Sequence, residues 1–265
     1  MLIGKPGTAT TSISTADPAS VTVRGKDLCS ELMGRLTFTE YFFLLVTGRE
    51  PSEAQRYFLD LLLVSIAEHG LVPTNQAARM TYAADPSSLQ GAVAAGILGC
   101  GSVVLGTSEL CGRFLAQARK ELESKGGPPG DIVRQMLESI RAKGGKAPGF
   151  GHPLHKPVDP RAERIFSLAG ERGIASVHVE LASHTAAAIG QVWGKALPMN
   201  VSMAIAAILL DLDFPLAMLK AIPILARTGG LLAHLAEEQE QPIGFLMAHH
   251  AQEAIGYEAA GNNDA

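Results

Sequence analysis

The stretch GFGHPLHKPVDPRA, residues 149–162, is the most informative part of this chain. Its two leading glycines let the backbone turn sharply and approach a ligand closely, and His152 can exchange a proton near neutral pH. Arg161 carries a planar guanidinium that can hold a carboxylate through two parallel hydrogen bonds. This density of reactive side chains predicts a binding or catalytic loop rather than an ordinary Gly/Pro-rich surface loop.

The composition predicts a soluble globular protein of one large or two small domains. The chain has 265 residues, of which 47% are hydrophobic and 18% charged, with a net charge of −4. This balance predicts neither a nucleic-acid partner nor a membrane partner, although local basic residues can still bind an anionic substrate. The most apolar segment, residues 91–105, is too short and too glycine-rich to span a bilayer, so we expect a buried helix there.

The cysteine usage favours a reducing, cytoplasmic location. Cys29, Cys100 and Cys111 form no CxxC or zinc pattern, and we expect Cys100 and Cys111 to be packed thiols in apolar surroundings. Residues 1–19 lack the continuous apolar core of a secretory signal.

Helical periodicity dominates, and strand-like alternation is scarce, so the predicted fold class is all-α. Ile132, Met136 and Ile140 lie four residues apart, and Asp131 is a plausible N-cap for their helix. Further helices are expected over residues 55–68, 202–212 and 216–235, and the last two are apolar nearly all round, which suits deep burial.

Residues 149–162 resemble the active-site motif of the citrate synthase superfamily, Gly-Phe-Gly-His-x-Val-Tyr-Lys-x-x-Asp-Pro-Arg-Ala. The resemblance extends from about Val23 to Tyr257, and this short chain is most similar to citryl-CoA lyase-like members and to the lyase domain of ATP-citrate lyase. Segments that look like the family's early helices and later landmarks are residues 24–28, 37–40, 44–48, 67–74, 198–201 and 226–230.

The resemblance implies a homodimer of all-α subunits. Each subunit would have a large domain, residues 1–108 and 215–265, and a smaller mobile domain, residues 109–214. Acyl-CoA would bind between them, with the loop 144–151 against the CoA nucleotide.

The same resemblance assigns roles to individual residues. His152 matches the histidine that hydrogen-bonds the oxaloacetate carbonyl or the citryl-CoA hydroxyl, and His69 matches the first substrate-binding histidine. Arg161 and Arg227 match arginines that bind carboxylates, and His155 stands where a tyrosine is usual. The residues expected to contact CoA are Lys146, Gly149, Phe150, Gly151 and Lys156.

Structural explanations compete with several of these roles. His69 could cap a helix C-terminus, Arg227 could form a buried ion pair, and Lys156 and His155 could face water. His234 is interpreted as a packing residue. The histidine spacing, with no accompanying carboxylate or cysteine, predicts no metal site.

Three departures from the family pattern bear on mechanism. Val104 stands at the position of the histidine that stabilises the acetyl-CoA enol, and Ser202 at that of the aspartate that removes its methyl proton. Phe245 lies near where synthases supply an arginine from the other subunit. Condensation without a placed base should be impaired by about 10²–10⁴-fold, so cleavage is favoured.

The predicted function is therefore retro-Claisen cleavage of citryl-CoA, or a close 3-hydroxy-dicarboxyl-CoA, to acetyl-CoA and oxaloacetate. In this scheme His152 accepts the hydroxyl proton and Ser202 or water protonates the enolate. No metal or redox cofactor is expected, because CoA arrives with the substrate. The alternatives are a condensing synthase and a non-catalytic acyl-CoA or carboxylate sensor.

Overall fold

The computed structural model describes residues 9–101 and 103–258, and these residues are mainly helical. Short strands and a π-helical turn precede the first α-helix: β1 Ser14–Ala16, β2 Val21–Val23, β3 Lys26–Asp27 and η1 Leu28–Leu32. The α-helices are α1 Phe38–Thr47, α2 Glu53–Ala67, α3 Pro73–Ala84, α4 Leu89–Leu98, α5 Thr107–Lys125, α6 Pro129–Ala142, α7 Pro160–Glu171, α8 Val177–Trp193, α9 Val201–Asp211, α10 Ala221–Glu240 and α11 Gly244–Ala254, with the 3₁₀ turn η2 Leu216–Met218 before α10.

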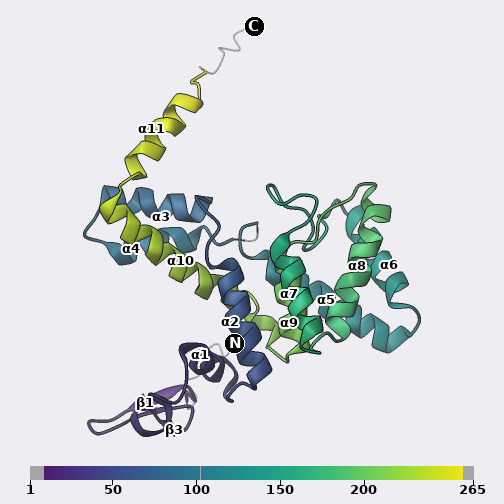
Figure 1. The fold of residues 1–265 in the computed structure, drawn as a ribbon, viewed down its shortest axis with the longest axis horizontal. Helices are drawn as coiled ribbons and strands as arrows, with labels where there is room; N and C mark the ends of the chain where they lie inside the picture. The colour runs from purple at the N-terminus through teal and green to yellow at the C-terminus, as the bar shows by residue number, and fades with distance from the viewer. Residues whose placement is uncertain (1–8, 102, 259–265) are drawn as a thin grey trace.

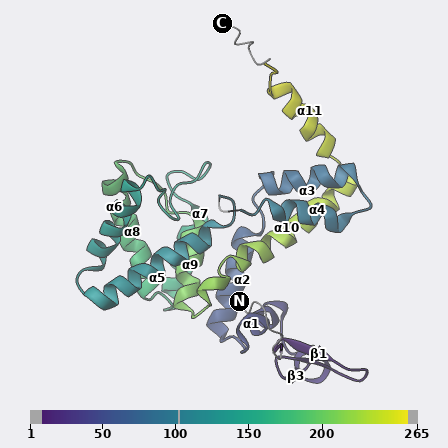
Figure 2. The same ribbon diagram turned by 180° about the vertical axis from the view of Figure 1, so that it is seen from behind.

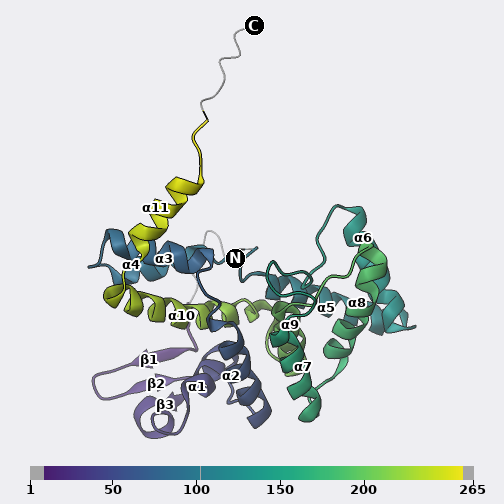
Figure 3. The ribbon, with the colours of Figure 1, turned by 45° about the horizontal axis from the view of Figure 1, so that its top comes forward.

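The helices gather into two groups on either side of α2 (Figure 1). One group holds α5 to α9, and the other holds α3, α4 and α10. The small sheet lies beside α1, and α11 contacts α3 and then extends away from the body (Figures 2 and 3). The division into a large and a mobile small domain stays a prediction.

Helix α9 forms the centre of the core. Its residues from Val201 to Leu209 are all buried, and it packs against α2, α5, α7 and α8. This placement confirms the prediction that the helix expected over residues 202–212, which is apolar nearly all round, is deeply buried. The segment Leu216–Glu240 is long and apolar enough to cross a membrane by composition, but here α10 packs against α2, α3 and α4.

Several sequence-based expectations need correction at the level of single elements. Residues 24–28 are not an early helix, because Arg24 and Gly25 both have positive φ and close the β2–β3 hairpin. The helix expected over 91–105 ends at Leu98, before three glycines that precede α5. Asp131 lies in the first turn of α6 rather than at its N-cap, which is Pro128. Cys100 and Cys111 are buried free thiols, as expected.

The carboxylate of Asp159 joins two helices at the edge of the core. The residue is fully buried and caps α7 by accepting a hydrogen bond from the backbone N–H of Arg161. It also accepts from the N–H of Val201, 3.1 Å away, at the start of α9, and forms an ion pair with Arg161 at 2.8 Å. Burial raises the pKa of Asp159, but the Arg161 side chain and these N–H groups together outweigh it and hold the pKa below its usual range.

The loop before α7 is tied to the start of α9 through its backbone. Gly151 N donates to Pro198 O at 2.8 Å, and Asn200 N donates to Gly149 O at 2.9 Å. Gly149 has φ +74°, and a Cβ there would come within 2.7 Å of Met203 Cβ and 2.8 Å of Cys111 Sγ. A side chain at this position would therefore be strained and would also collide with the core.

Gly149→Ala should lower the free energy of unfolding by about 2–5 kcal/mol, because backbone strain and overpacking add. Gly151→Ala is a matched control, since Gly151 has φ +88° but nothing within 4 Å of the added Cβ, and it should cost about 1–2 kcal/mol. Urea unfolding followed by circular dichroism measures both. Equal losses in the two variants would contradict the close packing of Gly149.

Asp159→Asn should destabilise the fold by about 3–5 kcal/mol at pH 7, because it removes one member of a buried charge pair. The folded-state pKa of Asp159 is depressed, so its contribution is present above the unfolded value near pH 4 and is lost as pH falls through the folded pKa. Urea unfolding of wild type and variant from pH 7 to pH 3 should show the difference shrinking at the acid end. A difference that stays constant would show that charge does not carry the effect.

Candidate active site

Three histidines from two distant segments meet between the helix groups. His69 follows the C-terminus of α2, and His152 and His155 lie in the loop before α7. The Nε2 atoms of His69 and His155 are 3.0 Å apart. The rings of His152 and His155 stack with centroids 4.4 Å apart, and those of His69 and His152 are 5.4 Å apart. His69 is therefore engaged with the loop side chains rather than only capping α2, and His155 is half-buried against its neighbours.

The protonation of His152 is set by the backbone of its own loop. The N–H groups of Leu154 and His155 both donate to His152 Nδ1, at 3.1 and 3.0 Å. A neutral imidazole with an accepting Nδ1 carries its proton on Nε2, so the free edge of this ring is a donor. His152 is thus suited to hydrogen-bond a substrate oxygen. It is not suited to the proton-accepting role that the sequence analysis gave it.

Both His69 and His152 favour the neutral form. Burial, the nearby Arg161 charge and the other imidazoles lower the pKa of each, with burial the largest cause, although Asp159 raises that of His152. At neutral pH these rings therefore act as hydrogen-bonding groups rather than as cations.

The sequence predicted no metal site, because no carboxylate or cysteine accompanies the histidines at the spacing of a metal motif. Ring nitrogens of His69, His152 and His155 lie within 4.8 Å of one another. A metal-bound histidine normally donates its other ring N–H to an acceptor, whereas His152 Nδ1 accepts two N–H groups. The donor set therefore fits a hydrogen-bonding role better than three-nitrogen coordination.

Arg161 lies close enough to lower the pKa of both His69 and His152. Its Nε and Nη2 bind the two oxygens of Asp159, at 3.0 and 2.8 Å. The two-pronged edge that the sequence analysis assigned to substrate is therefore occupied by Asp159. The Nη1 side remains for a ligand, and the ion pair fixes the direction in which it can point.

Arg227 on α10 is a buried guanidinium without a salt bridge to any described carboxylate. It is 3% exposed and donates to Asn75 Oδ1 at 3.1 Å and to Ile66 O at 3.4 Å. Its Nε has no hydrogen-bond partner among the described residues. Burial lowers the pKa of Arg227, while the Glu68 carboxylate, which forms no salt bridge with it, raises the pKa. A buried charge without a direct ion pair is costly, so this site suits an anionic ligand better than a structural ion pair.

A polar network that sequence reasoning missed orients Arg227. Asn75 is fully buried and donates to Glu68 Oε1 at 3.1 Å and to Gly70 O at 2.6 Å. His234 Nε2 lies 3.0 Å from Glu68 Oε2, and the His234 ring also lies 3.3 Å from Arg79. His234 is thus a member of the network rather than a simple packing residue. The sequence feature that could have indicated the network is Asn75, which directly follows Pro73 and Thr74.

Ser202 lies at a meeting of two helix N-termini. It is in the first turn of α9, and its hydroxyl is 2.6 Å from that of Thr107, the first residue of α5. The positive ends of both helix dipoles face this hydroxyl pair. Thr107 was not predicted as a site residue, and Val104 is half-buried in the turn just before it.

The remaining predicted positions differ in exposure. Gly149 is buried and Phe150 half-buried, while Lys146 and Lys156 are exposed, as a role at a CoA entrance requires. Phe245 on α11 is 71% exposed.

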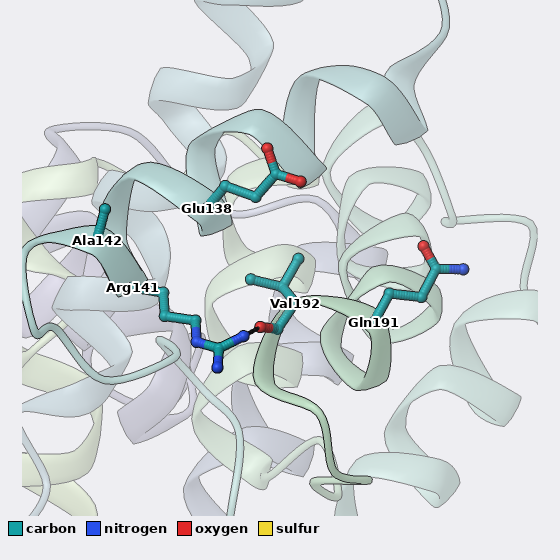
Figure 4. Close-up of a pocket in the computed structure, with 5 residues that line it drawn as sticks. All are labelled: Glu138, Arg141, Ala142, Gln191 and Val192. Carbon is teal, nitrogen blue, oxygen red and sulfur yellow. Dashed lines mark hydrogen bonds between the residues drawn. The ribbon is translucent and has the colours of Figure 1, made fainter.

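A separate shallow pocket lies between α6 and α8 (Figure 4). Arg141 donates to the Val192 carbonyl there, beside Glu138 and Gln191. None of the predicted site residues lines this pocket.

Known proteins resemble this chain over most of its length. It is 29% identical to a citrate synthase of Haloferax volcanii over 75% of this chain and 51% of that protein, and 27% identical to one of Synechocystis over 77% and 50%. The chain thus spans about half the length of these curated relatives.

Solved structures give the same fold. The citryl-CoA lyase of Hydrogenobacter thermophilus superposes with a TM-score of 0.83 at 29% identity, covering 98% of both chains. The ATP citrate lyase of Methanothrix soehngenii, solved with citrate and coenzyme A, superposes with a TM-score of 0.80 at 22% identity over 99% of this chain and 43% of that one.

The family description "Citrate synthase, C-terminal domain" matches residues 22–244. That match includes the histidine loop, both arginines and Ser202. With the helical fold and the convergence of these residues, it shows that this chain belongs to the citrate synthase family.

Proposed function

We propose that this protein cleaves citryl-CoA, or a close 3-hydroxy-dicarboxyl-CoA, to acetyl-CoA and oxaloacetate. The observation that carries the proposal is the buried Arg227 guanidinium, which forms no salt bridge with a described carboxylate and lies near His69. A tricarboxyl thioester supplies both the missing negative charge and the hydroxyl that a donor such as His152 can bind. Full-length similarity to a citryl-CoA lyase supports the same reaction.

The arginines and His152 have complementary roles in this reaction. Arg227 and the Nη1 side of Arg161 bind carboxylates of the oxo-acid half. His152 Nε2–H donates to the substrate hydroxyl oxygen, which becomes negative as its proton leaves. A donor that is fixed before the reaction stabilises such a developing charge without reorganisation.

The enolate of acetyl-CoA forms at the other end of the breaking bond. The Ser202–Thr107 hydroxyl pair lies at two helix N-termini, whose dipoles favour negative charge. We infer that this pair takes over the place of the missing family histidine and aspartate, and that Ser202 or water delivers a proton to the enolate carbon. A neutral hydroxyl is a poor base for a carbon acid, so the same site favours cleavage over condensation.

The exposed Lys146 and Lys156 flank the glycine loop and would bind the CoA phosphates at its entrance. We further propose a homodimer in which residues 109–214 close over the substrate and exclude water.

His152→Ala should lower kcat for citryl-CoA cleavage by about 10²–10³-fold, because the donor to the developing alkoxide is lost. Oxaloacetate release is followed with malate dehydrogenase and the loss of NADH absorbance. His184→Ala on α8, outside the site, is the control and should turn over like wild type. Wild-type turnover no faster than spontaneous breakdown, with CoA esters still bound, would favour the sensor alternative.

Arg227→Met should abolish stabilisation by citrate while leaving the ligand-free melting temperature unchanged or higher. Its buried charge has no carboxylate partner within the described residues, so removing it relieves a desolvation cost. Thermal denaturation with and without citrate measures both effects, since a ligand raises stability by RT ln(1 + [L]/Kd). A large loss of ligand-free stability would instead indicate that Arg227 has a structural role.

A further inference from the structure

We propose that His155 is the general base that removes the hydroxyl proton of the substrate, with His69 positioning it. This inference rests on the cleavage reaction proposed above. That reaction needs a group to accept the proton, and the ring of His152 cannot serve because its Nδ1 accepts two backbone N–H groups.

One of the two facing Nε2 atoms of His69 and His155 donates a hydrogen bond and the other accepts it. Burial is the main cause that favours neutral His69, and we place its single ring proton on Nδ1, away from the Nε2 atom that faces His155. In neutral His69, Nε2 is then an acceptor. His155 must donate from its Nε2, which leaves its Nδ1 with a free lone pair.

The stacked arrangement brings base and donor together. The rings of His152 and His155 have centroids 4.4 Å apart with 30° between their planes, and ring nitrogens of the two lie within 4.8 Å of each other, close enough to share one ligand oxygen. Among the residues that the structure describes, no donor hydrogen-bonds His155 Nδ1. One ring would therefore take the hydroxyl proton while the other donates to the oxygen.

Charged side chains surround the other two rings of the cluster. His69 and His152 face His155 from either side, and Arg161 and Arg227 contribute positive charge, while Asp159 contributes a negative one. The net effect on His69 and His152 disfavours further protonation.

The step balances without any further reactant. The hydroxyl proton moves to His155 Nδ1, and the oxygen electron pair forms the new carbonyl of oxaloacetate. The carbon–carbon bond breaks, and its electrons become the enolate of acetyl-CoA. The enolate carbon then takes one proton through Ser202 or water, and His155 releases its proton, so the proton count is restored.

The test compares His155→Gln with wild type. Glutamine keeps an N–H donor for His69 Nε2 but has no basic nitrogen, so kcat should fall about 10²–10⁴-fold while KM changes by less than about threefold. The fall in wild-type kcat toward acid pH should be absent from the variant's pH profile. His184→Gln on α8 is the matched control, and circular dichroism confirms folding. Separately, ¹⁵N NMR of the histidine rings should show a proton on Nε2 of both His152 and His155.

Each other result overturns the assignment in a distinguishable way. Near-normal kcat in His155→Gln, with wild type active, would overturn the role of His155 alone, as would a proton found on His155 Nδ1. Wild-type turnover lost with EDTA and restored by Zn²⁺ would show that the nitrogens are ligands. A wild type that does not cleave citryl-CoA at all would overturn the proposed function and the base role with it.

Discussion

The buried carboxylate of Asp159 is the constraint on which the candidate site depends. It caps α7, holds Arg161 and fixes the first N–H of α9. These contacts link the histidine loop, one cationic side chain and the core helix that carries Ser202. A single charge thus sets the relative positions of groups that are far apart in the sequence.

Positive charge and neutral imidazoles are combined in one small region. Arg227 lies in the interior with only neutral acceptors, while burial and neighbouring cations disfavour protonation of His69 and His152. The region therefore attracts an anion while keeping its proton-handling groups uncharged. Both properties arise largely from burial, which removes solvent from the guanidinium of Arg227 and from the two imidazoles.

Much of the fold follows from the sequence, but the details of the site do not. Uninterrupted apolar character identified α9 as a buried helix, and the Gly-His-Asp-Pro-Arg loop identified the site. The sequence did not reveal that Asp159 occupies the forked edge of Arg161, or that Asn75, Glu68 and His234 form a network around Arg227. The contacts of Asn75 with His234 and Arg227 join residues more than 150 positions apart, for which periodicity carries no signal. Asp159 and Arg161 are only two positions apart, but their pairing depends on the burial of Asp159, which the sequence does not show. The short sheet was missed because its strands have only two or three residues.

The contact between His69 and His155 joins a segment that follows α2 to the loop that precedes α7. It holds only while one of the two facing nitrogens lacks a proton, since two imidazolium rings would repel each other. One hydrogen bond thus links two segments that lie 86 positions apart in the sequence, and whatever breaks it removes this link between the end of α2 and the loop that carries His152.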